Sequence, residues 1–214
     1  MWGGASEHFA HLRISRQHGA MRKRNISVPG AERQVDYATG RMRGARQVPS
    51  PHCDDRPLGA PIDLLVIHGI SLPPGEFGGP WIERLFLGRL PTGVHAYFAQ
   101  IAGLKVAPHL LIRRDGELVQ FVPFHRRAWH AGASVFEGRG ACNDFSIGIE
   151  LEGCDELPYT DAQYAELAVV TRALMAAYPE ITPARIVGHA DIAPGRKTDP
   201  GPAFDWERFR RRLA

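Results

Sequence analysis

Residues 62–68, Ile-Asp-Leu-Leu-Val-Ile-His, form a nearly continuous apolar run of strand length. Such a run indicates a strand that is buried on both faces, as in a parallel sheet with helices on each side. The run stops at His68, which is followed by Gly69, so an imidazole is expected at the carboxyl end of the strand. Open α/β sheets bind their ligands at that edge, and the stretch therefore predicts both an α/β fold and the position of its site.

Other segments supply the remaining elements of one mixed α/β domain, with a central mixed sheet flanked by helices. Residues 35–62 contain several Pro and Gly and are expected to cross the surface as an ordered arm. A long irregular loop over 71–80 follows the first strand and is expected to wall one side of a cleft. The patterns then predict a helix after Pro80, a hairpin over 108–122, a core strand over 145–153, a capped helix from Thr160 to about Tyr178, a short strand over 185–188 and a closing helix over 205–213.

The basic charge of the chain is concentrated in its first 34 residues. They hold six Arg and Lys against two acids, a charge of +4, so the other 180 residues, with 20 basic and 21 acidic groups, carry −1. A folded part with that balance is not expected to bind nucleic acid. The first 34 residues show no sustained periodicity and are expected to be disordered or a non-native extension, with a native start near Val35 at a valine initiator codon and a folded domain over 35–214.

The sequence also indicates a cellular compartment. Neither an apolar run of membrane-spanning length nor the apolar core of a secretory signal is found, so a cytoplasmic protein with no membrane partner is expected. The three cysteines, Cys53, Cys142 and Cys154, are widely spaced and are expected to be free thiols in a reducing compartment. A monomer is expected.

Residues 188–201, Gly-His-Ala-Asp-Ile-Ala-Pro-Gly-Arg-Lys-Thr-Asp-Pro-Gly, gather reactive side chains in a segment too rich in Pro and Gly for a regular helix. His189 and Asp199 are of types that bind zinc, and a catalytic zinc ion takes three protein ligands and keeps a fourth position for water. His68 is the candidate for the third ligand. The alternative is a solvated loop in which Asp199 is a turn residue, with His68 as a structural residue at a strand end.

Glu150 lies on the polar side of the strand predicted over 145–153, with apolar neighbours on both sides. A buried carboxylate costs free energy unless it is paired or protonated, and a role as general base would explain its presence. With Lys197, these residues are the set that water activation by a metal ion requires, Lys197 and the metal stabilising the oxyanion of a tetrahedral intermediate. The pattern predicts amide hydrolysis, although its ligands would also accept other divalent ions.

Six motifs resemble the type 2 N-acetylmuramoyl-L-alanine amidase family, and the resemblance covers nearly the whole chain after about residue 35. They are VIHGISLPPGEFGGP (66–80), HLLIRRDGELVQFVPF (109–124), RAWHAG (127–132), CNDFSIGIELEG (142–153), YTDAQY (159–164) and GHADIAPGRKTDPGPAFDW (188–206). The resemblance implies the family's mixed α/β fold, one Zn²⁺ on His68, His189 and Asp199, and catalytic roles for Glu150 and Lys197. It implies as substrate an anhydro-muropeptide, cleaved between 1,6-anhydro-N-acetylmuramic acid and L-alanine in peptidoglycan recycling, a step that also affects β-lactamase induction.

Substrate contacts are expected from Trp129, His130, Lys105 and His109. Trp129 and His130 suit sugar or peptide contacts, the alternative being a half-buried Trp that anchors its loop. Gly69 stands where the family pattern has Asn, and Lys105 where it has Arg, and both changes remove hydrogen-bonding capacity. Two other functions compete with the anhydro-muropeptide amidase: a broad-specificity or lytic amidase, and a non-catalytic peptidoglycan-recognition module, which would be expected to have lost a ligand or the catalytic pair.

Overall fold

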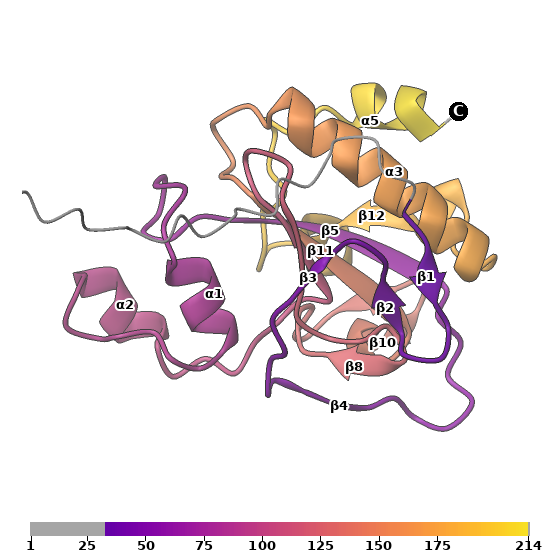
Figure 1. Cartoon of the computed structure of the whole chain (residues 1–214), viewed down its shortest axis with the longest axis horizontal. Helices are drawn as coiled ribbons and strands as arrows, with labels where there is room; N and C mark the ends of the chain where they lie inside the picture. Colours follow the sequence, from indigo (N-terminus) through magenta and orange to yellow (C-terminus); the bar gives the residue numbers. More distant parts are fainter. Residues whose placement is uncertain (1–32, 214) are drawn as a thin grey trace, which may run out of the picture.

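A six-stranded mixed sheet runs through the centre of residues 33–213, the part of the chain that the computed structural model describes (Figure 1). Four neighbouring strands are parallel, the fifth runs antiparallel to the fourth, and the sixth is parallel to the fifth. In spatial order they are β12 (Ile186–Gly188), β5 (Leu64–Ile70), β11 (Ser146–Glu152), β6 (Leu110–Ile112), β7 (Leu118–Gln120) and β3 (Arg46–Gln47). The expected mixed α/β fold is confirmed.

Helices α3 (Asp161–Ala177) and α5 (Trp206–Leu213) pack on one face of this sheet (Figure 1). The capping box predicted at Thr160 is present: its side chain accepts a hydrogen bond from the backbone N–H of Gln163, and the Gln163 side chain accepts one from the backbone N–H of Thr160. The buried stripe of α3 meets alternate residues of the two central strands, namely Leu65, Ile67, Ile147, Ile149 and Leu151. This face of the sheet forms the main hydrophobic core with α3 and α5.

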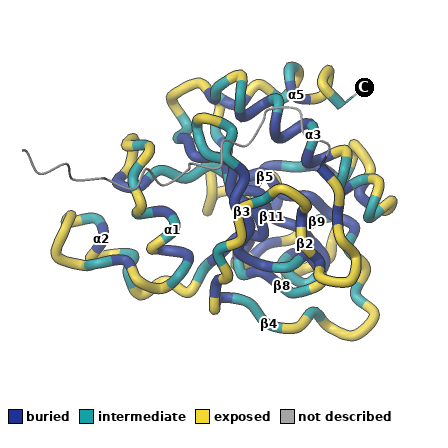
Figure 2. The backbone as a smooth tube through the Cα atoms, in the orientation of Figure 1, coloured by how far each residue is buried: buried dark blue, intermediate teal, exposed yellow. Residues whose placement is uncertain are grey.

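The other face of β5 and β11 leads to the site. Leu64 and Val66 pack there against Phe145 and Ile192, and the next residue on the same face is His68. Helices α1 (Trp81–Phe86) and α2 (Ala96–Ile101) form a second hydrophobic cluster beside β6 and β7. Figure 2 shows α2 as largely exposed at the margin of the molecule.

Three expectations need correction. The strand expected over 62–68 spans Leu64–Ile70, so His68 lies inside it. The ordered arm over 35–62 also contributes strands: β3 joins the central sheet, because Arg46 and Gln47 pair with β7. The third correction concerns the segment 188–201, which begins with a helical turn, α4 (His189–Ile192), and is not irregular throughout. Three further strand pairs and two short 3-10 helices complete the described fold. The pairs are β1 (Val35–Asp36) with β2 (Arg41–Met42), β9 (Val135–Phe136) with β10 (Arg139–Gly140), and β4 (Cys53–Asp55) with β8 (Arg126–Ala128), and the 3-10 helices are η1 (Cys142–Asp144) and η2 (Pro183–Arg185).

The extension predicted over 1–34 lies outside the described residues, apart from its last two. Arg33 belongs to the folded domain, because its Nε donates to Glu166 Oε1 at 2.7 Å and its side chain is 2% exposed. The domain therefore includes residues ahead of the expected boundary at Val35. Cys53, Cys142 and Cys154 are free thiols, as expected. Among the described helices, none is both long and apolar enough to cross a membrane.

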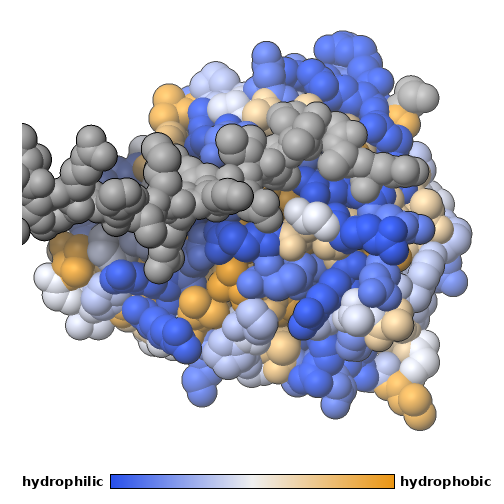
Figure 3. Space-filling view, viewed as in Figure 1, coloured by the Kyte–Doolittle hydropathy of each residue, from blue (hydrophilic) through white to orange (hydrophobic). Residues whose placement is uncertain are grey.

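Large hydrophobic side chains are exposed only at scattered positions of the described surface. On the face drawn in Figure 3, hydrophilic side chains occupy most of the surface that is not grey, with hydrophobic ones in smaller groups. The exposed large hydrophobic residues are Tyr37, Leu58, Val94, Leu104, Val135 and Leu157. Single exposed residues of this kind are ordinary in folded proteins and need no special explanation.

Candidate active site

Three neighbouring parallel strands bring the predicted site residues to one edge of the sheet. His68 of β5 and Glu150 of β11 are register partners on adjacent strands. His189 is the first residue of α4, directly after β12, and Asp199 returns on the loop that follows. Because parallel strands end at the same edge, side chains 121 residues apart in the chain meet there.

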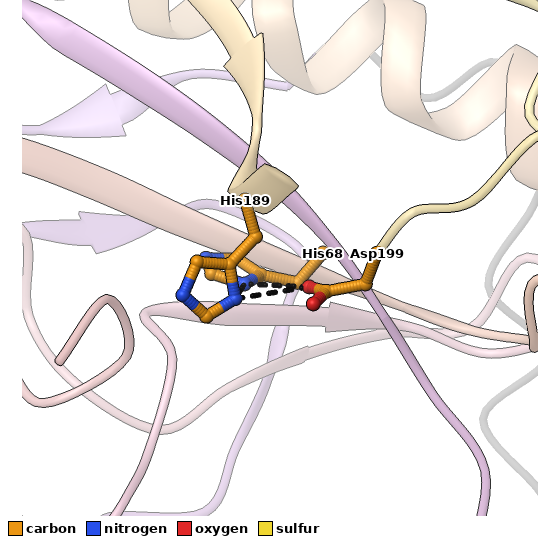
Figure 4. A group of neighbouring side chains, drawn as sticks. All are labelled: His68, His189 and Asp199. Carbon is orange, nitrogen blue, oxygen red and sulfur yellow. Dashed lines mark hydrogen bonds and ion pairs between the residues drawn. The ribbon is translucent and has the colours of Figure 1, made fainter. Parts of the chain in front are cut away.

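His68, His189 and Asp199 form a cluster of three potential metal ligands (Figure 4). The two Nδ1 atoms of the imidazoles lie 2.9 Å apart, and each lies 3.1 Å from Asp199 Oδ2. Both imidazoles are buried, whereas Asp199 is partly exposed. The structure therefore brings together the three residues that the sequence predicted as ligands.

The donor chemistry of this cluster fits a divalent cation. His189 Nε2 lies 3.0 Å from the carbonyl oxygen of Ala131, which can only accept, and 3.4 Å from Arg196 Nη2, which can only donate. The shorter contact decides, so Nε2 carries the proton and Nδ1 presents a lone pair. That lone pair faces the Asp199 carboxylate, a second acceptor, across 3.1 Å. Acceptors that converge in this way need a positive charge between them, and two imidazoles with one carboxylate are a ligand set of catalytic zinc.

The protonation states of the cluster agree with metal binding. Burial lowers the pKa of His68 to about 4, although the Asp199 carboxylate opposes this. Burial acts to raise the pKa of Asp199, but the imidazoles of His189 and His68 beside the carboxylate outweigh it and hold that pKa well below its ordinary value. His68 is therefore neutral and Asp199 ionised near neutral pH, the forms in which these groups bind metals.

Glu150 is a partly buried carboxylate beside this cluster. Its Oε2 atom is buried and has no hydrogen-bond partner among the described groups. Burial raises its pKa well above the ordinary value, the negative charge of Asp199 adds to the shift, and the positive charge of Lys197 opposes it. A cavity carboxylate with a raised pKa is suited to accept and return a proton near neutral pH.

The cluster opens into a cavity of about 570 Å³ with two kinds of wall. The polar wall includes Glu150, His189, Arg196, Lys197 and Asp199. The second set of lining residues is mainly apolar and comes from α1, α2 and the segment after α2, with Leu85, Phe86, Tyr97, Ile101, Leu104 and Val106. Ser71, Leu72 and Pro74 also line the cavity, so the loop expected to wall a cleft does so.

Comparison with known proteins identifies the family of this chain. The sequence profile described as N-acetylmuramoyl-L-alanine amidase matches residues 58–202, which is more than half of the chain. The chain belongs to this amidase family. The resemblance inferred from its motifs is confirmed, and a non-catalytic recognition module is disfavoured.

Relatives of this amidase share most of its length. The "1,6-anhydro-N-acetylmuramyl-L-alanine amidase AmpD" of Escherichia coli (strain K12) is 65% identical over 171 residues, which cover 80% of this chain and 93% of the relative. A crystal structure of a Se-Met AmpD derivative has a TM-score of 0.80 at 61% identity and covers 82% of this chain and 98% of its own. A complex of E. coli AmiD with anhydro-N-acetylmuramic acid-L-Ala-D-gamma-Glu-L-Lys has a TM-score of 0.54 at 29% identity, covering 73% and 60%.

The four predicted substrate contacts of the amidase lie in different settings. Trp129 lines the cavity, and its Nε1 also donates to Asp54 Oδ1 at 3.0 Å, which anchors its loop. His130 lines the cavity but is only 9% exposed. Lys105 is exposed between two lining residues and does not itself line the cavity.

His109 is the fourth of these residues, and the structure places it in the interior. It is 0% exposed and accepts a hydrogen bond at Nδ1 from the backbone N–H of Gly148. It does not line the cavity, so the substrate contact expected for it has no surface on which to form. Its position at the start of the hairpin did not indicate that other segments of the same protein would cover it.

The apolar wall was not predicted. Helix α2 is only six residues long and has one buried residue, Phe98, so its sequence lacks the periodicity that reveals a longer helix. Tyr159 was missed as well: its hydroxyl donates to the carbonyl of Pro200, beside Asp199, and a Cβ at Gly69 would collide with it. Arg196, which also lines the cavity, could have been predicted as a site residue from its position next to Lys197.

Proposed function

We propose that this amidase hydrolyses the amide between 1,6-anhydro-N-acetylmuramic acid and L-alanine of muropeptides, with a zinc ion held by His68, His189 and Asp199. The observation that carries the proposal is the His/His/Asp cluster beside Glu150, whose Oε2 has no hydrogen-bond partner among residues 33–213; Glu150, His189 and Asp199 all line the cavity. The substrate is supported by the name of a relative that is 65% identical over 93% of its length. The AmiD complex with an anhydro-muropeptide adds support for this class of ligand.

The reaction adds water to the amide carbonyl and breaks its C–N bond, which leaves a carboxylate on the sugar's lactyl group and a free amine on L-alanine. A bound zinc ion supplies Lewis acidity here, since it lowers the pKa of water and polarises a carbonyl. Glu150 accepts the proton of the attacking water and passes it to the departing amine, two tasks for which a raised pKa is suited. Lys197, an exposed cation of the cavity wall, stabilises the negative charge on the carbonyl oxygen.

This reaction would place the amidase in peptidoglycan recycling. The proposal includes a cytoplasmic location, an anhydro-muropeptide as its partner, and an effect on β-lactamase induction through the level of these fragments. It rests on the sequence resemblance and on the relative's name.

The deciding experiment compares amide cleavage of 1,6-anhydro-muramyl tripeptide with that of intact peptidoglycan. The purified protein is assayed as isolated, after chelation and after zinc is added back. Cleavage that favours the anhydro fragment, stops on chelation and returns with zinc is expected. Equal cleavage of intact peptidoglycan would mean a lytic amidase, and binding of the fragment without cleavage by the zinc-loaded protein would refute the proposed activity.

Two substitutions separate the base from the metal ligands. Glu150→Ala should keep zinc and lower kcat by about 10²- to 10⁴-fold, because a general base is lost. Asp199→Ala should lose zinc binding itself. Both are measured by zinc content after gel filtration and by turnover, and full activity of Glu150→Ala would exclude it as the base.

A further inference from the structure

The two histidines of the cluster are held from behind by consecutive residues of one loop. His68 Nε2 lies 2.9 Å from His130 Nδ1, and His189 Nε2 lies 3.0 Å from the carbonyl oxygen of Ala131. In both imidazoles, the atom held by the loop is Nε2, and the atom directed at Asp199 is Nδ1. The loop therefore contacts each ring at Nε2, the nitrogen that does not face Asp199.

These contacts bear on which nitrogen carries the proton. The carbonyl of Ala131 places the proton of His189 on Nε2. His68 has a free lone pair at Nδ1 only if its Nε2–H donates to His130 Nδ1. His130 must then carry its own proton on Nε2, where Ser146 Oγ lies 3.1 Å away and can accept it. The opposite arrangement would put a proton on His68 Nδ1 and leave the cluster one ligand short.

Two further residues hold this loop in place. The side-chain oxygen of Asn143 accepts hydrogen bonds from the backbone N–H groups of His130 and Ala131, at 3.1 and 2.8 Å. Gly148 of β11 leaves the space that the His130 ring occupies, because a Cβ there would collide with ring atom Nδ1. The His130 ring is thus held in place by its own backbone, which Asn143 anchors, and by its close contact with β11 at Gly148.

We propose that His130 and Ala131 are positioning residues for the metal site, which keep both imidazoles with Nδ1 toward the ion, and that Asn143 fixes the backbone that presents them. The proposal rests on the proposed function, because it assumes zinc at His68, His189 and Asp199. In this proposal, His130 contacts the proposed metal ligand His68 instead of the substrate. Residues that orient metal ligands in this way commonly change metal affinity by about 10- to 100-fold when they are replaced.

The test compares two substitutions of similar size at His130. Asn keeps an acceptor oxygen near the position of Nδ1, whereas Leu has almost the same shape and no acceptor. Zinc affinity is measured without substrate, by competition with a chromophoric chelator. We expect His130→Leu to bind zinc about 10- to 100-fold more weakly and His130→Asn to stay within about threefold of the parent protein. Equal affinity of all three proteins, or an equal loss in both variants, would overturn the proposal.

A second pair tests the loop without altering any group that touches a ligand. Asn143→Asp keeps an acceptor for both N–H groups, and Asn143→Ala removes it, so only the Ala variant should lose zinc affinity. Thermal unfolding of the zinc-free proteins checks that each variant folds. If the parent cleaves its substrate with zinc while His130→Leu and Asn143→Ala retain full affinity, this inference fails and the proposed function stands. A parent protein that binds no zinc would overturn both.

Discussion

Glu150 is placed where a carboxylate is costly to the fold and where the proposed reaction needs a base. Its Oε2 has no hydrogen-bond partner among the described groups, and the charge of Asp199 opposes its ionisation. Replacement by a neutral side chain should therefore relieve the fold while it removes the base. Residues that lower stability and raise activity in this way are characteristic of active sites.

We predict that Glu150→Gln stabilises the zinc-free protein in a pH-dependent manner. The pKa of Glu150 is raised in the folded state above the ordinary value of 4.5, so the protonated group is tolerated and the ionised group is not. The advantage of Gln should be absent below about pH 4, grow as pH rises above the unfolded-state pKa, and level off above the folded-state pKa. Its size should be about 1.4 kcal/mol for each unit by which the pKa is raised.

Urea unfolding of both proteins at a series of pH values measures this difference. Glu156→Gln is the control, because it changes an exposed carboxylate that lines the same cavity. A stability difference for Glu150→Gln that does not vary with pH would contradict the prediction.

At the scale of elements, β11 carries two carboxylates on one face with separate tasks. Glu150 lies beside the cluster of His68, His189 and Asp199, and Glu152, two residues on, ties the loop over 71–80 to the hairpin. Glu152 accepts hydrogen bonds from the backbone N–H of Gly78 at 2.7 Å and from that of Arg114 at 3.2 Å, and its side chain also pairs with Arg113. Because this loop lines the cavity, one strand carries the proposed base and also anchors a wall of the site.

We predict that Glu152→Gln lowers the free energy of unfolding by about 1–3 kcal/mol, because a buried acceptor of two backbone N–H groups and a guanidinium is weakened. Faster hydrogen exchange over 71–80 and a higher KM should accompany the loss, with zinc affinity unchanged. Glu117→Gln is the matched control: Glu117 contacts the same Arg113 but is about one-third exposed, and its loss should cost less than about 1 kcal/mol. Equal effects of the two substitutions would count against an anchoring role.

For the whole molecule, the three proposed metal ligands join separate parts of the chain. They lie on β5, at the start of α4 and on the loop after it. An ion held by all three would link the centre of the sheet to the C-terminal segment, and it would bind the folded state in preference to the unfolded one. Metal affinity is therefore coupled to stability.

We predict that free zinc at about 1,000 times its Kd raises Tm by roughly 10 °C, from about 4 kcal/mol of linked stabilisation in a domain of this size. Calorimetry of the chelated and the zinc-loaded protein measures the shift. Asp199→Ala, which lacks one ligand, should show a much smaller shift. An equal shift in both proteins would place the zinc elsewhere.

The sequence by itself determined the elements whose signals are local, and the chemical types of the site residues. The apolar run before His68, the hairpin turn at Asp115 and the capping box at Thr160 each depend on neighbours within a few residues, and all three are present. His68 and His189 were candidate ligands because each follows a predicted strand and parallel strands end at one edge of a sheet, and Asp199 was one because of its residue type in the loop after His189.

Only the tertiary structure decided which distant groups the polar side chains contact. His130 lies 62 residues from His68 in the chain, and no local pattern shows that their rings meet. The burial of His109, the addition of β3 to the sheet and the apolar wall from α2 likewise depend on which distant segment packs opposite. A sequence pattern reports whether a side chain suits burial, whereas its hydrogen-bond partner is set by the packing of segments that are far apart in the chain.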